Sequence, residues 1–351
     1  MKPARVVPPR RRPWSAVFLP LAAAGLAVLA SFTAGSATPA LVLDVVSVPL
    51  NPSDPSQTTV GPLRFRGGLW LRSSDPRFGG LSDLRIGEDG ARLIAVSDCG
   101  RGFTAALRYD AAGDLVWLGS PHLVDLAGPG GRALERSEID AEALALDESG
   151  GLLVGFEGKP RIWRYADRPA FGGIPVPQPV PLLDACPATR GLETIASLGD
   201  GRLLLVCEGQ GRDPGSCPAW IGAGDAWVER AYPLDASATG LGEAFHPTSA
   251  AVLPDGDVLV LERRFPPIGA RLVRLSRADL DGTAHALSPR VVAVLEPPVT
   301  LDNFEGLSVR TGPEGETLVY LLSDDNGCAK RPPVVPPRLQ RTLLLLFALA
   351  E

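Results

Sequence analysis

The sequence lacks what several familiar mechanisms need. It has three histidines and five cysteines, and no CxxC pair or cysteine–histidine cluster, so a zinc site is not expected. It has no Gly-x-Ser-x-Gly elbow, which argues against an α/β-hydrolase, and no Walker loop or dinucleotide fingerprint. A Ser-His-Asp triad would need one of His122, His246 and His285, of which His246 is the best candidate, but such a histidine is more often a polar loop residue.

Methionine and amphipathic helical segments are also scarce. The chain has 1 Met in 351 residues, whereas 39 Gly and 35 Pro are spread along it. It is 45% hydrophobic, enough for a sizeable core, and its length fits one large domain or two ordinary ones. This composition favours a turn-rich, mainly β protein over a disordered one.

The N-terminus differs from the rest of the chain. Five basic residues precede an apolar run from Trp14 to Phe32, and small residues follow up to Ala37. This is the layout of a secretory signal, although the run is close to the roughly 20 residues that span a bilayer. We expect residues 1–40 to be a signal peptide or an N-terminal anchor. The protein would then be exported, to the periplasm or outside the cell, and membrane-anchored if the segment is retained.

The charge balance restricts the partners. The formal net charge is −6, and residues 1–40 hold only basic groups, so the remainder is more acidic still. An acidic exported protein is a poor candidate for nucleic-acid binding and a reasonable one for cations. We expect small-molecule chemistry, a monomer, and membrane contact only through an uncleaved N-terminal segment.

The cysteines suggest disulfides without fixing the pairing. An oxidising compartment would allow them, and the odd count leaves one thiol over. Cys207 and Cys217 flank a glycine-rich loop and are candidates for a short bridge. Cys99 and Cys328 each follow an Asp-containing strand end, and they are candidates for a bridge if the first and last units of the chain are neighbours.

One pattern recurs along the chain. A short apolar segment leads into a turn rich in Gly and Asp, then a stronger apolar run, then an acid. The copies begin at Gly80, Asp140, Gly191, His246 and Asn303. Their spacing of roughly 50–60 residues is in the range of propeller blades. The turns are hairpin turns between short apolar runs, so each copy predicts a pair of strands.

Further β-like segments extend each copy to three or four strands. They are 105–109, 161–165, 226–232, 271–275 and 342–347. Because one such sheet cannot bury both faces alone, we expect an all-β fold over residues 63–351, a β-propeller of five or six four-stranded blades. A sixth, degenerate blade would lie between Gly209 and Gly242. Residues 63–71 would pair with 340–347 to close the ring, and 41–62 would form an extended linker.

Two sets of acids recur within the copies. The first stands at the start of the innermost strand: Asp83, Glu142, Glu193 and Glu305. The second follows the next strand: Asp98, Glu157, Glu208, Glu262 and Asp324. If both sets converge at one mouth, the carboxylates repel one another unless cations or protons intervene, and hard cations take such oxygen ligands. The alternative is that each acid only accepts backbone N–H groups at a blade corner.

Several short motifs, in order, resemble a known family. They are Phe78-Gly79-Gly80-Leu81-Ser82, Ser97-Asp98, Asp140-Ala141-Glu142-Ala143, Gly191-Leu192-Glu193, Glu262-Arg263, Asn303-Phe304-Glu305-Gly306-Leu307, Ser323-Asp324-Asp325-Asn326 and Gln340-Arg341-Thr342-Leu343. In this order they resemble the bacterial phytase-like family, described as having the esterase-like activity of phytase, over roughly Leu63 to Phe347. The resemblance implies a propeller and hydrolysis of phosphate or ester bonds.

These observations lead to a functional hypothesis. We expect an exported hydrolase of phosphate or carboxylic esters that acts on a small anionic or ester substrate, with Ca²⁺ as the candidate ion and no organic cofactor. Both sets of acids are candidate metal ligands, and the expected catalytic residues are Glu142, Glu193, Glu305 and Arg263. Two alternatives stay open, namely a non-catalytic propeller serving as a binding scaffold at the envelope and a calcium-dependent lactonase.

Overall fold

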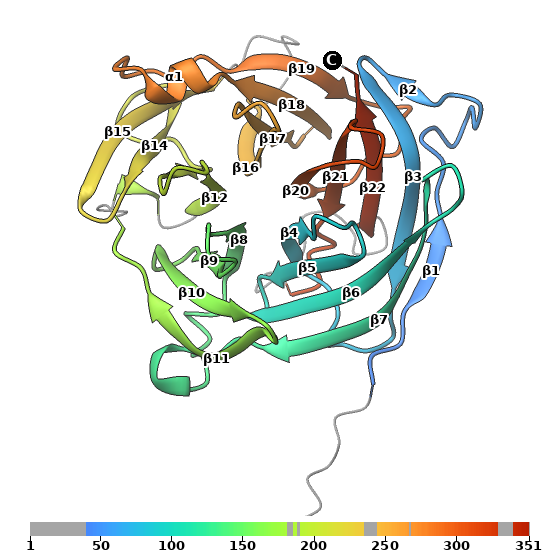
Figure 1. The fold of residues 1–351 in the computed structure, drawn as a ribbon, viewed down its shortest axis with the longest axis horizontal. Coiled ribbons are helices and arrows are strands. Elements are labelled where there is room, and N and C mark those ends of the chain that lie inside the picture. Colours follow the sequence, from blue (N-terminus) through green and yellow to red (C-terminus); the bar gives the residue numbers. More distant parts are fainter. Residues whose placement is uncertain are drawn as a thin grey trace, which may run out of the picture. The chain divides into compact units, whose positions relative to one another are not determined.

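The computed structural model describes residues 40–180, 185–187, 190–234, 244–266, 268–328 and 340–350. They form five antiparallel sheets arranged around a central axis (Figure 1), so the prediction of an all-β propeller is confirmed. The expected signal or anchor lies almost wholly outside the described residues. Within the described ranges, no helix is long and apolar enough to cross a membrane.

Four blades are consecutive four-stranded meanders with the first strand innermost (Figure 1). Blade 1 holds β4 (Leu81–Ile86), β5 (Arg92–Ser97), β6 (Arg101–Tyr109) and β7 (Leu115–Asp125). Blade 2 holds β8 (Ala141–Leu146), β9 (Leu152–Phe156), β10 (Arg161–Asp167) and β11 (Ala170–Pro177). Blade 3 holds β12 (Leu192–Ser197), β13 (Leu203–Cys207), β14 (Ser216–Ala223) and β15 (Ala226–Pro233). Blade 4 holds β16 (His246–Val252), β17 (Val258–Arg264), β18 (Gly269–Leu275) and β19 (Arg290–Leu295). Short helices η1 (Pro129–Gly131) and α1 (Arg277–Asp281) lie in the connections.

Blade 5 joins the two ends of the domain. Its inner strands are β20 (Phe304–Thr311), β21 (Thr317–Ser323) and β22 (Thr342–Leu349), and its outer strand is β3 (Leu63–Arg72). The antiparallel pairing of β3 with β22 confirms the predicted closure of the ring. Residues 41–62 contribute β1 (Asp44–Ser47) and β2 (Thr59–Val60), which also pair with β3. The closure holds the first and last blades together because β3 cannot leave without breaking its ladder with β22.

The predicted sixth blade is wrong. The segment from Gly209 to Gly242 supplies β14 and β15, which are the third and fourth strands of blade 3. Residues 235–242 of that segment lie outside the described residues. The sequence pattern places β15 as the third strand of its blade and overlooks β14, because β14 follows a loop instead of a tight hairpin turn.

The core is divided among the blade interfaces. Five clusters of buried apolar side chains each combine residues of two neighbouring blades, for example Leu84 with Tyr320 between blades 1 and 5, and Leu261 with Phe304 between blades 4 and 5. Each sheet therefore buries both faces against its neighbours, which explains why the inner strands read as nearly continuous apolar runs.

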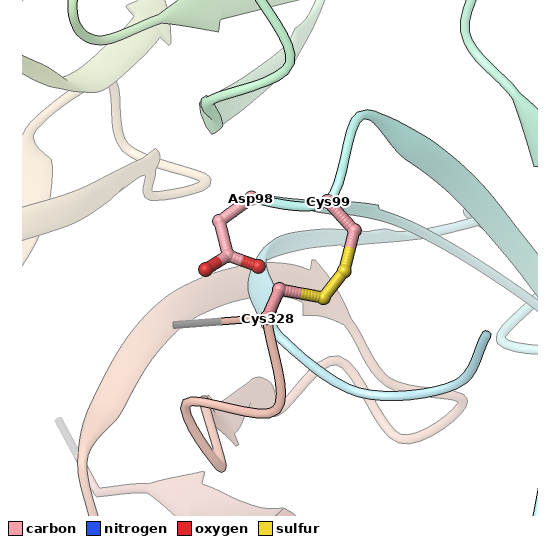
Figure 2. A group of neighbouring side chains, drawn as sticks. All are labelled: Asp98, Cys99 and Cys328. Atoms are coloured by element: carbon pink, nitrogen blue, oxygen red, sulfur yellow. A yellow bond between two sulfur atoms is a disulfide. The ribbon is translucent and has the colours of Figure 1, made fainter. Parts of the chain in front are cut away.

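Two disulfides cross-link the fold. Cys99, after β5, bonds to Cys328, after β21, and ties blade 1 to blade 5, so this candidate bridge is present (Figure 2). The candidate bridge from Cys207 to Cys217 does not form, because Cys207 bonds to Cys186 and Cys217 is a buried free thiol. Cys207 packs in the core between blades 2 and 3, whereas Cys217 packs between blades 3 and 4. The two side chains lie on opposite faces of one sheet and cannot meet.

Candidate functional site

Each blade carries a β-bulge near the start of its innermost strand. In blade 2, Ala141 lies opposite Phe156 and Ala143 opposite Gly155, which leaves Glu142 as the extra residue. The same shift occurs in the other four blades. The bulged residues are Ser82, Glu142, Glu193, Thr248 and Glu305. A bulge re-aims a side chain, so these five positions turn toward the same mouth of the ring.

A second set of side chains follows the neighbouring strand. In each blade, one residue of the second strand lies opposite the residue that precedes the bulge, and the position after it is occupied by Asp98, Glu157, Glu208, Arg263 or Asp324. We call these five positions the rim. In four blades the backbone N–H of the rim residue donates to the carbonyl of the residue two positions before the bulge, as from Glu157 to Asp140 at 2.8 Å. We call the acids that gather here the acidic mouth. They are Asp98, Asp140, Glu142, Glu157, Glu193, Glu208, Glu305 and Asp324.

Asp83 does not belong to the acidic mouth. It stands one residue after the bulge, level with Ala143 and Ser249 of other blades, and a shift of one residue turns a side chain to the other face. It is fully buried and accepts hydrogen bonds from the N–H of Leu144 and the hydroxyl of Ser249, both at 2.8 Å, and from the N–H of Leu307 at 3.3 Å. Its carboxylate therefore joins blades 1, 2, 4 and 5 on the axis.

Arg85 completes the junction on the axis. Its guanidinium lies 3.2 Å from Asp83 and donates to the carbonyls of Leu307, Ile195 and Ala250. We call Asp83 and Arg85 the axial plug, because together they contact all five blades. Burial raises the pKa of Asp83 to about 6, although Arg85 and the donated hydrogen bonds oppose the rise. The role that this geometry supports for Asp83 is structural.

Glu262 also faces away from the acidic mouth. It lies opposite Pro247, level with Phe156 and Cys207, which point into blade interfaces. Its carboxylate is fully buried, accepts a hydrogen bond from the Tyr232 hydroxyl at 2.5 Å and pairs with Arg271. Its position on the rim is taken by Arg263. Glu262 therefore forms a buried ion pair within blade 4, and the hydrogen bond from Tyr232 joins it to blade 3.

Burial and neighbouring carboxylates together raise the pKa values of the two central acids of the acidic mouth, Glu142 and Glu193. Burial raises the pKa of Glu142 well above its usual value, and the carboxylates of Glu193, Asp98, Glu305 and Asp140 raise it further. Burial and the carboxylates of Glu208, Glu157 and Glu305 do the same to Glu193. Glu142 and Glu193 thus interact electrostatically with acids of other blades, so the fold brings the acids of the acidic mouth close to one another.

The pKa values of three more acids of the mouth, Glu305, Asp324 and Glu157, are raised as well. Burial raises the pKa of Glu305 to about 7, with Arg263 opposing and Glu208 adding to the rise. Burial followed by repulsion from Glu305 and Asp98 raises that of Asp324 well above its usual value. Burial also raises the pKa of Glu157, although Glu157 accepts the N–H groups of Arg190 and Gly191.

Arg263 is the basic residue that stands within the ring of rim positions. Its guanidinium lies 3.0 Å from Glu208 and 3.2 Å from Glu305, and it donates to the Asn303 side chain at 2.9 Å. Burial acts to lower the pKa of Arg263, but Glu208, Glu305 and Glu193 outweigh it and the pKa is raised. Arg263 therefore stays charged and neutralises part of the ring on the side of blades 3 to 5.

Blade 2 offers a grouping suited to a metal ion. One oxygen each of Asp140, Glu142 and Glu157 lies within 4.8 Å of the others. Asp140 was not among the predicted ligands; the signal for it was its place at the start of the second copy, where other copies have Gly, His or Asn. Asp98 lies beside Cys99 and Cys328, but the disulfide occupies both sulfurs, so only the Asp98 carboxylate remains as a ligand there (Figure 2).

Comparison with known proteins addresses the fold and the family. Virginiamycin B lyase from Staphylococcus aureus aligns with 9% identity and a TM-score of 0.41, over 88% of this chain and 100% of that one. The WD40 repeats of RRP9 align with 10% identity and a TM-score of 0.43, over 87% of this chain and 100% of that one. A luciferin-regenerating enzyme aligns with 11% identity and a TM-score of 0.41, over 87% and 98%. No curated protein matches the sequence. The phytase-like family, described as esterase-like activity of phytase, matches residues 76–327, well over half of the chain, and the protein therefore belongs to this family.

Proposed function

We propose that the protein is a calcium-dependent hydrolase of phosphate esters that acts at the acidic mouth. The observation that carries the proposal is the convergence of eight carboxylates from four blades on one opening, with three of them within 4.8 Å of one another. The two disulfides support export to an oxidising compartment outside the cytoplasm, where such bonds persist.

The donor set fits a hard divalent cation. Asp140, Glu142 and Glu157 would hold it through carboxylate oxygens, the ligands that Ca²⁺ prefers. A cation is also needed for substrate binding, because an uncompensated ring of acids repels a phosphate group. When bound, the ion would neutralise the phosphate oxygens and lower the pKa of a bound water.

Three side chains of the acidic mouth have separate roles in the proposed reaction. Glu305, with a pKa of about 7, suits proton transfer from water near neutral pH and is the proposed general base. Arg263, at 3.2 Å, fixes the position of Glu305 and adds positive charge beside the substrate. Glu193, 6% exposed, lies among the same charges, and its high pKa suits it to hold a proton in the resting state.

The test is hydrolysis by the purified full chain after removal of metal. With calcium we expect phosphate release from p-nitrophenyl phosphate or inositol hexakisphosphate, and a chelator should abolish it. Glu142→Gln should weaken calcium activation at least about 10-fold, since loss of a metal-supporting group has effects of this size or larger. Glu229→Gln, on the exposed edge strand β15, is the matched control and should leave activation unchanged.

Other outcomes would redirect the proposal. Turnover of p-nitrophenyl acetate alone would indicate carboxylic esters, and turnover of a lactone alone would favour the lactonase. Calcium binding without any turnover would favour the non-catalytic scaffold. One observation points that way, because Glu157 accepts the backbone N–H groups of Arg190 and Gly191, as a structural acid at a blade corner does.

A further inference from the structure

Arg190 stands at the edge of the acidic mouth in an uncommon backbone conformation. Its φ is 71°, in the left-handed region that favours glycine. Its N–H donates to Glu157, as does that of Gly191 at 3.0 Å, which anchors the turn in front of β12. A glycine would adopt this conformation with less strain. An arginine here therefore points to a use for the side chain, in keeping with the tendency of strained residues to gather at functional sites.

His246 positions the Arg190 guanidinium. His246 Nδ1 lies 2.8 Å from the carbonyl oxygen of Glu208, and its Nε2 lies 3.4 Å from an Arg190 terminal nitrogen. A carbonyl can only accept, so Nδ1 carries the proton; a guanidinium can only donate, so Nε2 presents its lone pair. The two partners select one neutral tautomer. Because His246 is only 8% exposed, its ring is fixed and orients Arg190.

The two arginines near Glu208 differ in how they are held. Arg263 lies 3.0 Å from one Glu208 oxygen and also contacts Glu305 and Asn303. Arg190 lies 3.9 Å from the other Glu208 oxygen, and its side chain is 47% exposed, against 27% for that of Arg263. A ligand above the mouth can therefore reach the Arg190 guanidinium in the orientation that His246 gives it, whereas Glu208, Glu305 and Asn303 cover more of Arg263.

We propose that Arg190, positioned by His246, binds the phosphate group of the substrate and makes the site selective for dianionic phosphomonoesters over phosphodiesters and neutral esters. A planar guanidinium holds two phosphate oxygens at once, and a dianionic group gains most from it. The inference rests on the proposed hydrolase function and adds the substrate class to it. Arg190 is a binding residue, and His246 is a positioning residue.

The test compares substrates of different charge in the calcium-loaded full chain. Arg190→Gly keeps the left-handed turn without the side chain, and Arg190→Gln keeps a polar side chain without the charge. Each should raise KM for p-nitrophenyl phosphate by about 10-fold, the scale of one charge-assisted hydrogen bond. Each should raise KM less for bis(p-nitrophenyl) phosphate and leave that for p-nitrophenyl acetate unchanged. Arg101→Gln, whose guanidinium pairs with Asp125, is the matched control and should not change any of the three.

The positioning role of His246 has its own readout. His246→Ala should raise KM for the phosphomonoester with little change in kcat, and His246→Gln, which restores an acceptor near the place of Nε2, should recover part of the loss. A purely structural histidine would instead lower the melting temperature in both variants without separating KM from kcat.

Binding of inorganic phosphate separates this inference from the hydrolase proposal. If no ester is turned over, the hydrolase proposal fails, and calorimetric titration of the calcium-loaded chain with phosphate still tests Arg190. About 10-fold weaker binding in Arg190→Gly than in the unaltered chain supports the inference. Equal binding by the two proteins, no phosphate binding by the unaltered chain, or the same rise in KM for all three esters would overturn it.

Discussion

Raising the pH should destabilise the cation-free protein, because folding forces ionisable acids together in the acidic mouth. Burial, with Glu208 and Glu157 adding, brings the pKa of Glu305 to about 7 in the fold, against an ordinary 4.5. Between these two pH values the folded chain keeps a proton that the unfolded chain has released. The unfolded state then binds fewer protons than the folded one, so the free energy of unfolding falls as the pH rises through this window.

The size of the effect follows from the shift. One pKa unit corresponds to about 1.4 kcal/mol, so Glu305 alone should remove about 3 kcal/mol between pH 4.5 and 7. Glu142, Glu193 and Asp324 are shifted in the same direction and add to the loss. Against a typical stability of about 5–15 kcal/mol, such a change is easily measured.

The assay is urea unfolding at a series of pH values, once with a chelator and once with calcium. With the chelator, stability should fall from pH 4.5 to 7, and calcium should restore about 2.7 kcal/mol at a hundred times its Kd. Glu305→Gln should flatten the slope by about one proton, and Glu229→Gln should not. A stability that is flat or rises with pH in the chelated protein would refute the picture of a mutually repelling ring.

Two further predictions concern stability. Asp83→Ala should cost about 3–5 kcal/mol, because it leaves Arg85 buried without its partner, whereas Glu305→Gln should cost far less; equal losses of unfolding free energy in urea would contradict the axial plug. Replacing Cys99 and Cys328 by alanine should cost about 5 kcal/mol and replacing Cys186 and Cys207 about 3, because the bridged residues are 229 and 21 positions apart; the reverse order in urea would argue against this chain-entropy account.

The architecture could be read from the sequence because its signals are local. The hairpin turns, the apolar runs and their repeat each mark one blade, and five marked copies became the five blades seen among the described residues. The closing pair of β3 and β22 could also be predicted, since a ring needs partners for its first and last strands. The disulfide partner of Cys207 could not be predicted from the sequence, because strand register determines on which face of the sheet a cysteine lies.

Strand register also determines which acids belong to the acidic mouth. Asp83 and Asp98 are fifteen apart, as are Glu142 and Glu157, yet only the second pair joins a bulge to the rim. The hairpin turn of blade 1 is one residue longer than that of blade 2, so its bulge falls at Ser82 and Asp83 turns onto the axis. A spacing count cannot distinguish an extra residue in the turn from one in the strand, so it assigns Asp83 to the ring. Glu262 is assigned to the ring because it is the acid at the end of its strand, but the rim position is the next residue, Arg263.

The axial plug gives the two ends of the ring different chemistry. Beyond Arg85, the opposite end opens into a pocket of about 450 Å³ that is lined mostly by small or apolar side chains such as Ala145, Ala196 and Ala250. The bulged and rim acids all stand at the other end. Because Asp83 and Arg85 bind groups from every blade, they close the path between the two ends. Among the described residues, a substrate held at the acidic mouth is therefore reached from that end of the ring, where Arg190 stands at the edge.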